Sequence, residues 1–150
     1  MKKTILHIAC VVFLISGFAN IFTSCSEDVD EASVLYGSWQ LVAEQKNDED
    51  VELSSCALGE LLYFMPEGIC YVYYPCEEID LRTAWNYEAE HNILNISDLL
   101  PVTFYVENAG AGRLVLKYYE YDDSGVLDTY YKEYKQVKTV LTDGKIRLAE

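Results

Sequence analysis

The sequence is poor in histidine and in basic residues, and both shortages limit what the protein can do. It holds two histidines among 150 residues. His7 lies in an apolar N-terminal run, so the rest of the chain has only His91, which excludes a histidine-rich metal site and most histidine-dependent catalysis. Eleven Lys and Arg stand against 25 Asp and Glu, for a formal net charge of −14. So acidic a chain repels nucleic acid and anionic membranes, and we expect neither as a partner.

The acidic residues lack the spacing of a catalytic or metal-binding motif. They gather at residues 48–52, 77–80 and 122–123, and no cluster has the Asp-x-Asp-x-Asp-Gly order that wraps a calcium ion in one loop. No pair of carboxylates stands out as the acid and base of a glycosidase. We interpret the clusters as solvated loops, and we predict a protein that is not an enzyme and uses no metal or cofactor.

Helical periodicity is missing after the N-terminal run, because no apolar pattern of period 3.6 extends over a dozen residues. Short apolar or alternating runs, rich in the strand-forming aromatic and β-branched residues, are separated by turn residues roughly every 8–12 positions. This pattern predicts an all-β fold, an antiparallel up-and-down meander of about eight strands that closes into a barrel and so removes its edges. The expected strands lie near residues 35–45, 59–66, 69–75, 81–89, 92–98, 102–108, 113–121 and 126–141, with a further one at 145–149.

The first 24 residues have the order of a lipoprotein signal peptide. Lys2 and Lys3 precede an apolar run over residues 4–22, and Thr23-Ser24-Cys25 ends it. We predict cleavage before Cys25, which would carry the lipid as the only attachment to the membrane. Residues 25–33 would then form an acidic tether and residues 34–150 a single domain. The alternative for the apolar run is an uncleaved anchor or a buried core helix.

The serine and acidic residues directly after Cys25, Ser26-Glu27-Asp28, resemble the surface-export signal of Bacteroidetes lipoproteins. The resemblance implies an outer-membrane lipoprotein that is exposed at the cell surface. The alternative is a plain solvated linker, which would leave the protein facing the periplasm.

Strand alternation assigns inner and outer faces to the tyrosine-rich segment 113–134. Leu114, Leu116 and Tyr118 share the side expected to form the core. Pairing across the turn at residues 122–125, with a loop of two or of four residues, would place Tyr131 on this inner side as well. The same register predicts four outer rings that form a contact patch for a partner or a seat for residues 138–150. These rings are Tyr119, Tyr121, Tyr130 and Tyr134.

Three cysteines follow Cys25, which predicts one disulfide and one free thiol in an oxidising compartment. A hairpin turning at Glu67-Gly68 would set Met65 opposite Cys70, beside the turn, and would leave Cys56 close to Cys76 at the hairpin base. Only the second pair can meet without a movement of the backbone. We therefore predict a Cys56–Cys76 disulfide and a free Cys70.

The Gly-x-Trp motif at Gly37 and Trp39 resembles the opening of lipocalin-like domains. Paired cysteines, a Phe-x-x-x-Gly hairpin and aromatic strands over roughly residues 34–121 are similar to the pattern of Bacteroidetes lipocalin-like lipoproteins. The matching segments are Leu35–Val42, Cys56, Leu62–Phe64, Gly68, Cys76, Trp85–Tyr87 and Leu94–Ile96. The resemblance implies a small closed or half-open barrel in which Trp39 packs at the base, Phe64 points inward and the two cysteines are bridged. The basic residue that covers the motif tryptophan, Trp39, would be Lys135 or Arg147, or would be missing.

Large side chains on the inner faces would either fill the barrel or line a ligand site. These candidates are Trp39, Phe64, Tyr71, Trp85, Tyr87, Tyr118 and Tyr131. We therefore expect a lipid-anchored, non-enzymatic binding protein of the bacterial envelope, whose ligand is a small apolar molecule, a glycan or a protein. The alternative is an accessory lipoprotein with a filled interior that acts through a protein partner. A cavity larger than roughly 300 Å³ would favour the ligand.

Overall fold

The computed structural model describes residues 30–99 and 102–149, so the expected signal peptide and the expected lipidation site at Cys25 lie outside the described residues. Residues Glu31–Glu150 form one compact unit. In the described part of the chain, no helix is long and apolar enough to cross a membrane. The short helices are 3₁₀ turns: η1 (Glu31–Leu35), η2 (Ala57–Gly59) and η3 (Ala89–His91).

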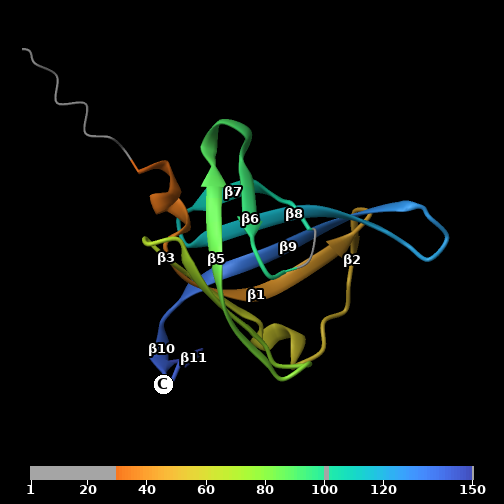
Figure 1. Ribbon diagram of the computed structural model, residues 1–150. Helices are drawn as coiled ribbons and strands as arrows, with labels where there is room; N and C mark the ends of the chain where they lie inside the picture. Colours follow the sequence, from red (N-terminus) through yellow and green to blue (C-terminus); the bar gives the residue numbers. More distant parts are fainter. Residues whose placement is uncertain (1–29, 100–101, 150) are drawn as a thin grey trace, which may run out of the picture. The chain divides into compact units, whose positions relative to one another are not determined.

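The unit is built almost entirely of β-strands (Figure 1). Each strand expected from the sequence has a counterpart, but the last long one is divided into β9 and β10. The strands are β1 (Gly37–Lys46), β2 (Glu49–Asp50), β3 (Leu61–Met65), β4 (Ile69–Tyr74), β5 (Ile79–Glu88), β6 (Ile93–Ile96), β7 (Phe104–Gly110), β8 (Arg113–Tyr121), β9 (Leu127–Val137), β10 (Thr139–Thr142) and β11 (Lys145–Leu148).

Nine strands form one antiparallel sheet in the order β2-β1-β3-β4-β5-β6-β7-β8-β9, which confirms the expected meander. Strand β1 also pairs with β9, from Ser38 opposite Val137 to Lys46 opposite Tyr130. The hydrogen bonds therefore ring through eight strands, with β2 attached beside β1. A register shift between Leu41 and Ala43 interrupts the β1–β9 ladder, as a β-bulge does where a strand must bend.

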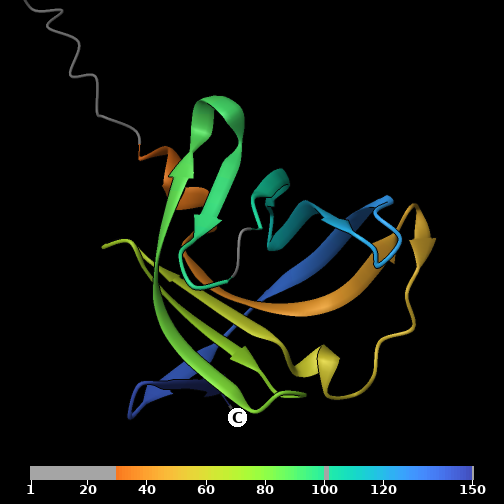
Figure 2. The same ribbon diagram turned by 45° about the vertical axis from the view of Figure 1, so that its right-hand side comes forward.

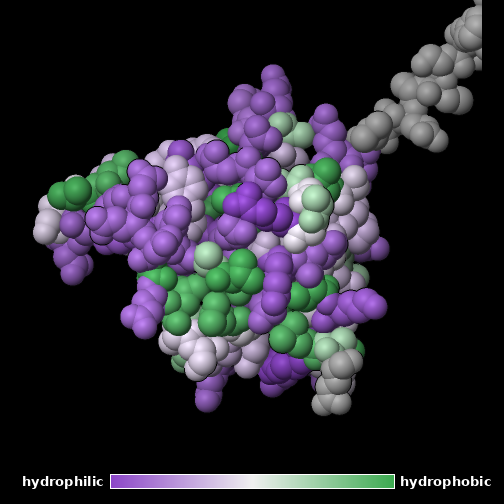
Figure 3. Space-filling model, turned by 180° about the vertical axis from the view of Figure 1, so that it is seen from behind, coloured by the Kyte–Doolittle hydropathy of each residue, from purple (hydrophilic) through white to green (hydrophobic). Residues whose placement is uncertain are grey.

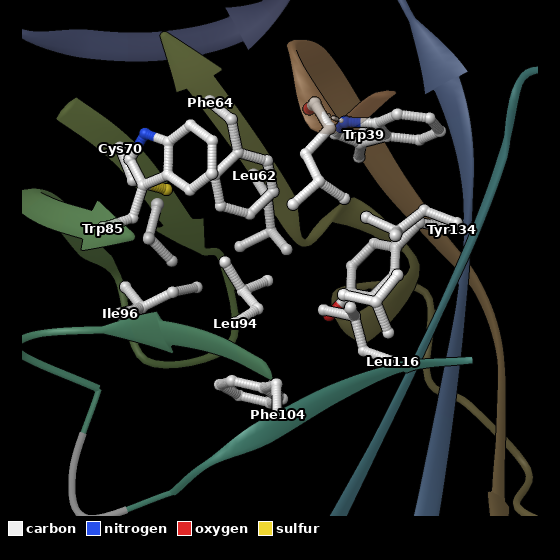
Figure 4. Close-up of a cluster of buried hydrophobic side chains, with 14 of the residues drawn as sticks. Trp39, Leu62, Phe64, Cys70, Trp85, Leu94, Ile96, Phe104, Leu116 and Tyr134 are labelled. Atoms are coloured by element: carbon white, nitrogen blue, oxygen red, sulfur yellow. Dashed lines mark hydrogen bonds between the residues drawn. The ribbon is translucent and has the colours of Figure 1, made fainter. Parts of the chain in front are cut away.

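The inner faces of these strands form one hydrophobic core (Figure 4). Its fully buried members mostly alternate with half-buried or exposed residues along the strands, as expected from the pleat. Among them are Trp39, Leu41, Leu62, Phe64, Cys70, Leu94, Leu114 and Leu116. The preceding turn η1 adds Leu35, whose carbonyl oxygen accepts a hydrogen bond from Trp39 Nε1 at 2.8 Å. The compact unit thus begins at Glu31, three residues inside the expected tether.

Two turns contain three residues each, and this shifts the register that the sequence predicted. Met65 pairs with Ile69 across Pro66-Glu67-Gly68, so Phe64, not Met65, faces Cys70. Gly68 ends the loop at φ +72°, a left-handed conformation that suits glycine and is typical of three-residue hairpin loops. The expected inward position of Tyr71 is therefore wrong: it lies on the outer face, with its ring stacked 6.3 Å from that of Tyr63.

The β8–β9 turn has the same form and the same consequence. The Asp122 backbone N–H donates to the Val126 carbonyl oxygen at 2.8 Å, which leaves Asp123-Ser124-Gly125 as the loop and pairs Tyr121 with Leu127. An odd loop moves every β9 side chain to the face opposite the one predicted. Tyr130 and Tyr134 consequently lie on the inner side with Tyr118 and Leu114, and Tyr131 lies outside with Lys117.

The C-terminal hairpin β10–β11 packs on the outside of β3, β4 and β5 (Figure 2). It buries Ile146, and the Arg147 guanidinium lies 4.0 Å from the centre of the Tyr73 ring and donates to both carboxylate oxygens of Asp80. This position corrects two expectations. The C-terminal segment is seated on β3–β5 and not on the β8–β9 tyrosines, and Arg147 covers Tyr73 in place of Trp39.

Candidate functional site

An open cavity of about 590 Å³ is lined by inner-face residues of β1 and of β3 to β9. Its walls are mostly apolar, because the alternating inner residues of these strands converge there. The apolar lining residues include Leu41, Leu62, Leu81, Ile96, Phe104 and Leu116. Figure 4 shows several of them pointing toward one another across the interior. A volume of this size is in the range of small-molecule sites.

Three polar side chains meet in one wall of this cavity. Glu60 is buried and accepts two hydrogen bonds, from Tyr134 Oη to Oε1 at 2.6 Å and from Lys132 Nζ to Oε2 at 2.8 Å. Lys132 also lies 5.9 Å from the centre of the Tyr74 ring. A buried carboxylate is costly unless it is paired and hydrogen-bonded, and this arrangement satisfies both oxygens of Glu60.

The position of Glu60 follows from the local chain geometry between η2 and β3. Its backbone N–H donates to the Ala57 carbonyl oxygen at 3.0 Å, and its carbonyl oxygen accepts from Leu41 N at 3.1 Å. The preceding turn is joined to the end of β4 by the Cys56–Cys76 disulfide, as expected from the sequence. Ala57 and Cys76 both line the cavity, so the disulfide holds part of the cavity wall in place.

Burial changes the acid–base properties of the side chains around the cavity. The pKa of Glu44 is raised, mainly by burial, while Lys132 acts against this rise and Glu60 adds to it. Burial likewise raises the pKa of Tyr118 and that of Tyr134 far above the value of a solvated tyrosine. These phenols therefore stay neutral at physiological pH and are hydrogen-bonding groups, not anions.

The structure distributes the predicted site residues among three places. Trp39, Phe64 and Trp85 belong to the packed core, and only Tyr118 of the predicted set lines the cavity. Tyr87 is half-buried on the core side, with its hydroxyl donating to Asn92 Oδ1 at 3.0 Å. Tyr71 and Tyr131 lie on the outer face, as described above.

The cavity also contains residues that the sequence analysis did not assign to the interior. Tyr134, expected outside, is part of its lining, and Glu44, Glu60, Tyr74 and Lys132 join it. The sequence contains a signal for the burial of Glu60, because this charged residue directly precedes the apolar run Leu61-Leu62. Glu44, Tyr74 and Lys132 had no such signal, because they meet the rest of the site only through the pairing of strands that are distant in sequence.

The predicted outer patch is smaller than expected and has different members. Tyr119 is 42 % exposed, and its ring centre lies 5.9 Å from that of Tyr105 and 5.2 Å from Lys117 Nζ. Lys117 also lies 5.5 Å from the centre of the Tyr131 ring. Tyr121 is 70 % exposed nearer the end of the β8–β9 ribbon. Without Tyr130 and Tyr134 the four-ring patch does not form.

Hydrophobic residues are exposed at the end of this ribbon and elsewhere on the surface (Figure 3). At the ribbon end, Val126 is 58 % and Leu127 48 % exposed. Single exposed hydrophobic residues are normal on soluble domains, and acidic neighbours at Asp122 and Asp123 accompany these two. These exposed residues are therefore weaker evidence for a binding site than the cavity is.

Other reactive chemistry is limited in the described part of the chain. Cys70 is buried and free, and burial raises the pKa of its thiol to about 12, so it does not form the nucleophilic thiolate. Among the described residues, no group of three or more His, Cys, Asp or Glu side chains could hold a metal ion. Neither feature supplies a catalytic centre.

Comparisons with models of known protein families and with curated proteins found no match for this chain.

Proposed function

We propose that the protein is a lipid-anchored, lipocalin-like binding protein of the bacterial envelope that holds a small, largely apolar molecule inside a β-barrel. The observation that carries the proposal is the cavity of about 590 Å³ with mainly apolar walls. It exceeds the roughly 300 Å³ that marks a small-molecule site. The Gly-x-Trp motif and the lipoprotein-like N terminus support the family and the location.

The polar cluster in the cavity wall supports a ligand over a purely structural interior. A filled interior would pack apolar side chains against each other, whereas here Glu60, Lys132 and Tyr134 are held beside open space. Binding sites commonly combine apolar walls with a few positioned polar groups. The second reading, an accessory lipoprotein acting through a protein partner, is supported only by the exposed end of the β8–β9 ribbon.

Ligand binding is tested with a small neutral probe, 4-phenylbutanol. The full-length chain is reconstituted into phosphatidylcholine nanodiscs, and unfolding is followed by the fluorescence of the buried Trp39 and Trp85. A ligand that binds only the folded state stabilises it by about 1.4 kcal/mol at roughly ten times its Kd. The expected result is a rise in Tm of a few degrees. No rise at any soluble concentration, either with this alcohol or with its amine and carboxylate analogues, would contradict the proposal.

Two matched variants decide whether the probe occupies the cavity. Ala57→Phe introduces a ring at a lining position, and we expect it to remove the rise in Tm. Ala43→Phe adds the same ring at an exposed position of β1 outside the cavity and should leave the rise intact. Equal loss in both variants would contradict binding in the cavity.

The proposed anchor is tested separately, with Cys25→Ala. We expect the wild type to incorporate labelled fatty acid and to sediment with outer membranes. The variant should do neither, because it lacks the thiol that carries the lipid. Membrane association unchanged by this substitution would contradict the lipoprotein assignment without affecting the cavity.

A further inference from the structure

Acidic side chains outnumber basic ones in the lining of the cavity. Five carboxylates, from Glu44, Glu60, Glu77, Asp98 and Glu120, stand against a single amine from Lys132. That amine is already bound to Glu60 at 2.8 Å. Among the described residues, the remaining four carboxylates have no cationic side chain within 4.0 Å, so the cavity has a net negative charge.

Two of these carboxylates line the cavity together with the Tyr118 ring. Glu44 on β1 and Glu120 on β8 both act on Tyr118, since their charges add to the effect of burial in raising its pKa. Residues 118 and 120 are two apart on β8 and therefore project to the same side of the strand. The Tyr118 ring is held in place by Tyr130, stacked at 4.9 Å between ring centres.

Glu44 is half-buried beside an amine that is already paired with another carboxylate. It lies opposite Lys132 in the β1–β9 ladder, but Lys132 bonds to Glu60, and burial is the largest influence on the Glu44 carboxyl. A carboxylate that is partly removed from water gains from any cation placed beside it. Aromatic faces add to this preference because their quadrupole attracts cations.

We propose that the ligand is a cationic amphiphile, an aliphatic or aromatic body that carries a protonated amine. This inference rests on the proposed binding function and names the class of ligand. The amine lies beside Tyr118, on the side of the cavity lined by Glu44 and Glu120, and the apolar body lies against the half-buried lining residues Leu81, Leu99 and Val102. A bare metal ion is a poorer occupant, because the described residues contain no group of three ligands that could hold one.

The test compares three probes that share one apolar body and differ in charge: 4-phenylbutylamine, 4-phenylbutanol and 4-phenylbutyrate. Their Kd values are measured at pH 7.5 by calorimetry on the full-length chain in phosphatidylcholine nanodiscs, with empty nanodiscs subtracted. We expect the amine to bind about tenfold more tightly than the alcohol, because a nearby opposite charge shifts a carboxyl pKa by about one unit or more, which corresponds to about tenfold in affinity. The carboxylate should bind most weakly.

Matched variants separate the local site from the overall acidity of the chain. Glu44→Gln combined with Glu120→Gln should reduce the preference for the amine over the alcohol to about threefold or less. Glu67→Gln combined with Glu52→Gln makes the same change of charge at exposed residues outside the cavity, and the preference should stay within about twofold of the wild type. Equal loss in both pairs would overturn the assignment of the amine to Glu44 and Glu120.

The outcomes for the two proposals differ. Binding of 4-phenylbutyrate as tightly as 4-phenylbutylamine would overturn the inferred ligand class, while the cavity would remain a binding site. Failure of all three probes to bind would overturn the binding function itself and the inference with it.

Discussion

Tyr134 donates its hydroxyl hydrogen to Glu60 at 2.6 Å, and the two residues are 74 positions apart in the chain. Both side chains are buried. The bond joins the middle of β9 to the corner before β3, and Lys132, two residues before Tyr134, occupies the other oxygen of the same carboxylate. The Glu60 carboxylate thus connects β9 with the corner between η2 and β3. Removing one partner of a buried carboxylate is strongly destabilising. We therefore expect the stability of the fold to depend on this contact.

We predict that Tyr134→Phe lowers the free energy of unfolding by about 1–3 kcal/mol, the usual range for leaving one buried hydrogen-bonding atom without a partner. Urea unfolding at pH 7, followed by tryptophan fluorescence, measures the change. Tyr121→Phe is the control, because Tyr121 is 70 % exposed, and its effect should stay within about 0.5 kcal/mol. Equal effects in the two variants would show that the hydroxyl of Tyr134 contributes nothing.

The order of the long strands could be predicted from the sequence, whereas the short strand β2, the break between β9 and β10 and the faces of two strands could not. Alternation within β8 placed Leu114 and Leu116 inside correctly, because strand period is a local property. The pairing of β9 with β8 depends on loop length, and sequence reasoning assumed an even loop. A loop of three residues ending in Gly125 at φ +76° reversed the faces of Tyr130, Tyr131 and Tyr134.

The same error occurred at Gly68, where a three-residue loop shifted the partner of Met65 from Cys70 to Ile69. The disulfide was nevertheless predicted correctly, because a shift of one residue leaves Cys56 close to Cys76 and far from Cys70. The residues of the candidate site were predicted less well than the disulfide. Glu60 and Lys132 meet only after the β1–β9 pairing closes the sheet, and this contact has no signal in the local sequence.

The disulfide stabilises the corner that carries Glu60. Replacing both Cys56 and Cys76 with Ser should lower the free energy of unfolding by about 3 kcal/mol, because the bridge closes a loop with a sequence separation of 20. Urea unfolding measures this loss. Thiol alkylation gives an independent check: among Cys56, Cys70 and Cys76, only Cys70 should be modified in the unfolded, unreduced wild type. A peptide in which Cys70 is linked to either partner would contradict the assignment.

The C-terminal hairpin contributes to stability through Ile146, which is buried against the outside of β3–β5. Ile146→Ala should lower the free energy of unfolding by about 2–5 kcal/mol, the cost of removing a buried aliphatic side chain and leaving a cavity. Val140→Ala on the neighbouring strand is the matched control, since Val140 is 49 % exposed, and it should change the value by about 0.5 kcal/mol or less. If chemical denaturation gives equal values for the two, the hairpin does not pack as described.

The raised pKa of Glu44 predicts how the stability of Glu44→Gln depends on pH. Burial is the main cause of the rise, Lys132 opposes it, and Glu60 adds to it. At pH values below the unfolded-state pKa of about 4.5, the carboxyl is protonated in both states, so its ionisation changes nothing. As pH rises through the folded-state pKa, ionisation favours the unfolded chain. Glu44→Gln should therefore gain stability relative to wild type between about pH 4.5 and pH 7, and this gain should be absent at pH 4. Urea midpoints measured across this range test it; a difference that stays constant with pH would show that Glu44 is not destabilised by burial.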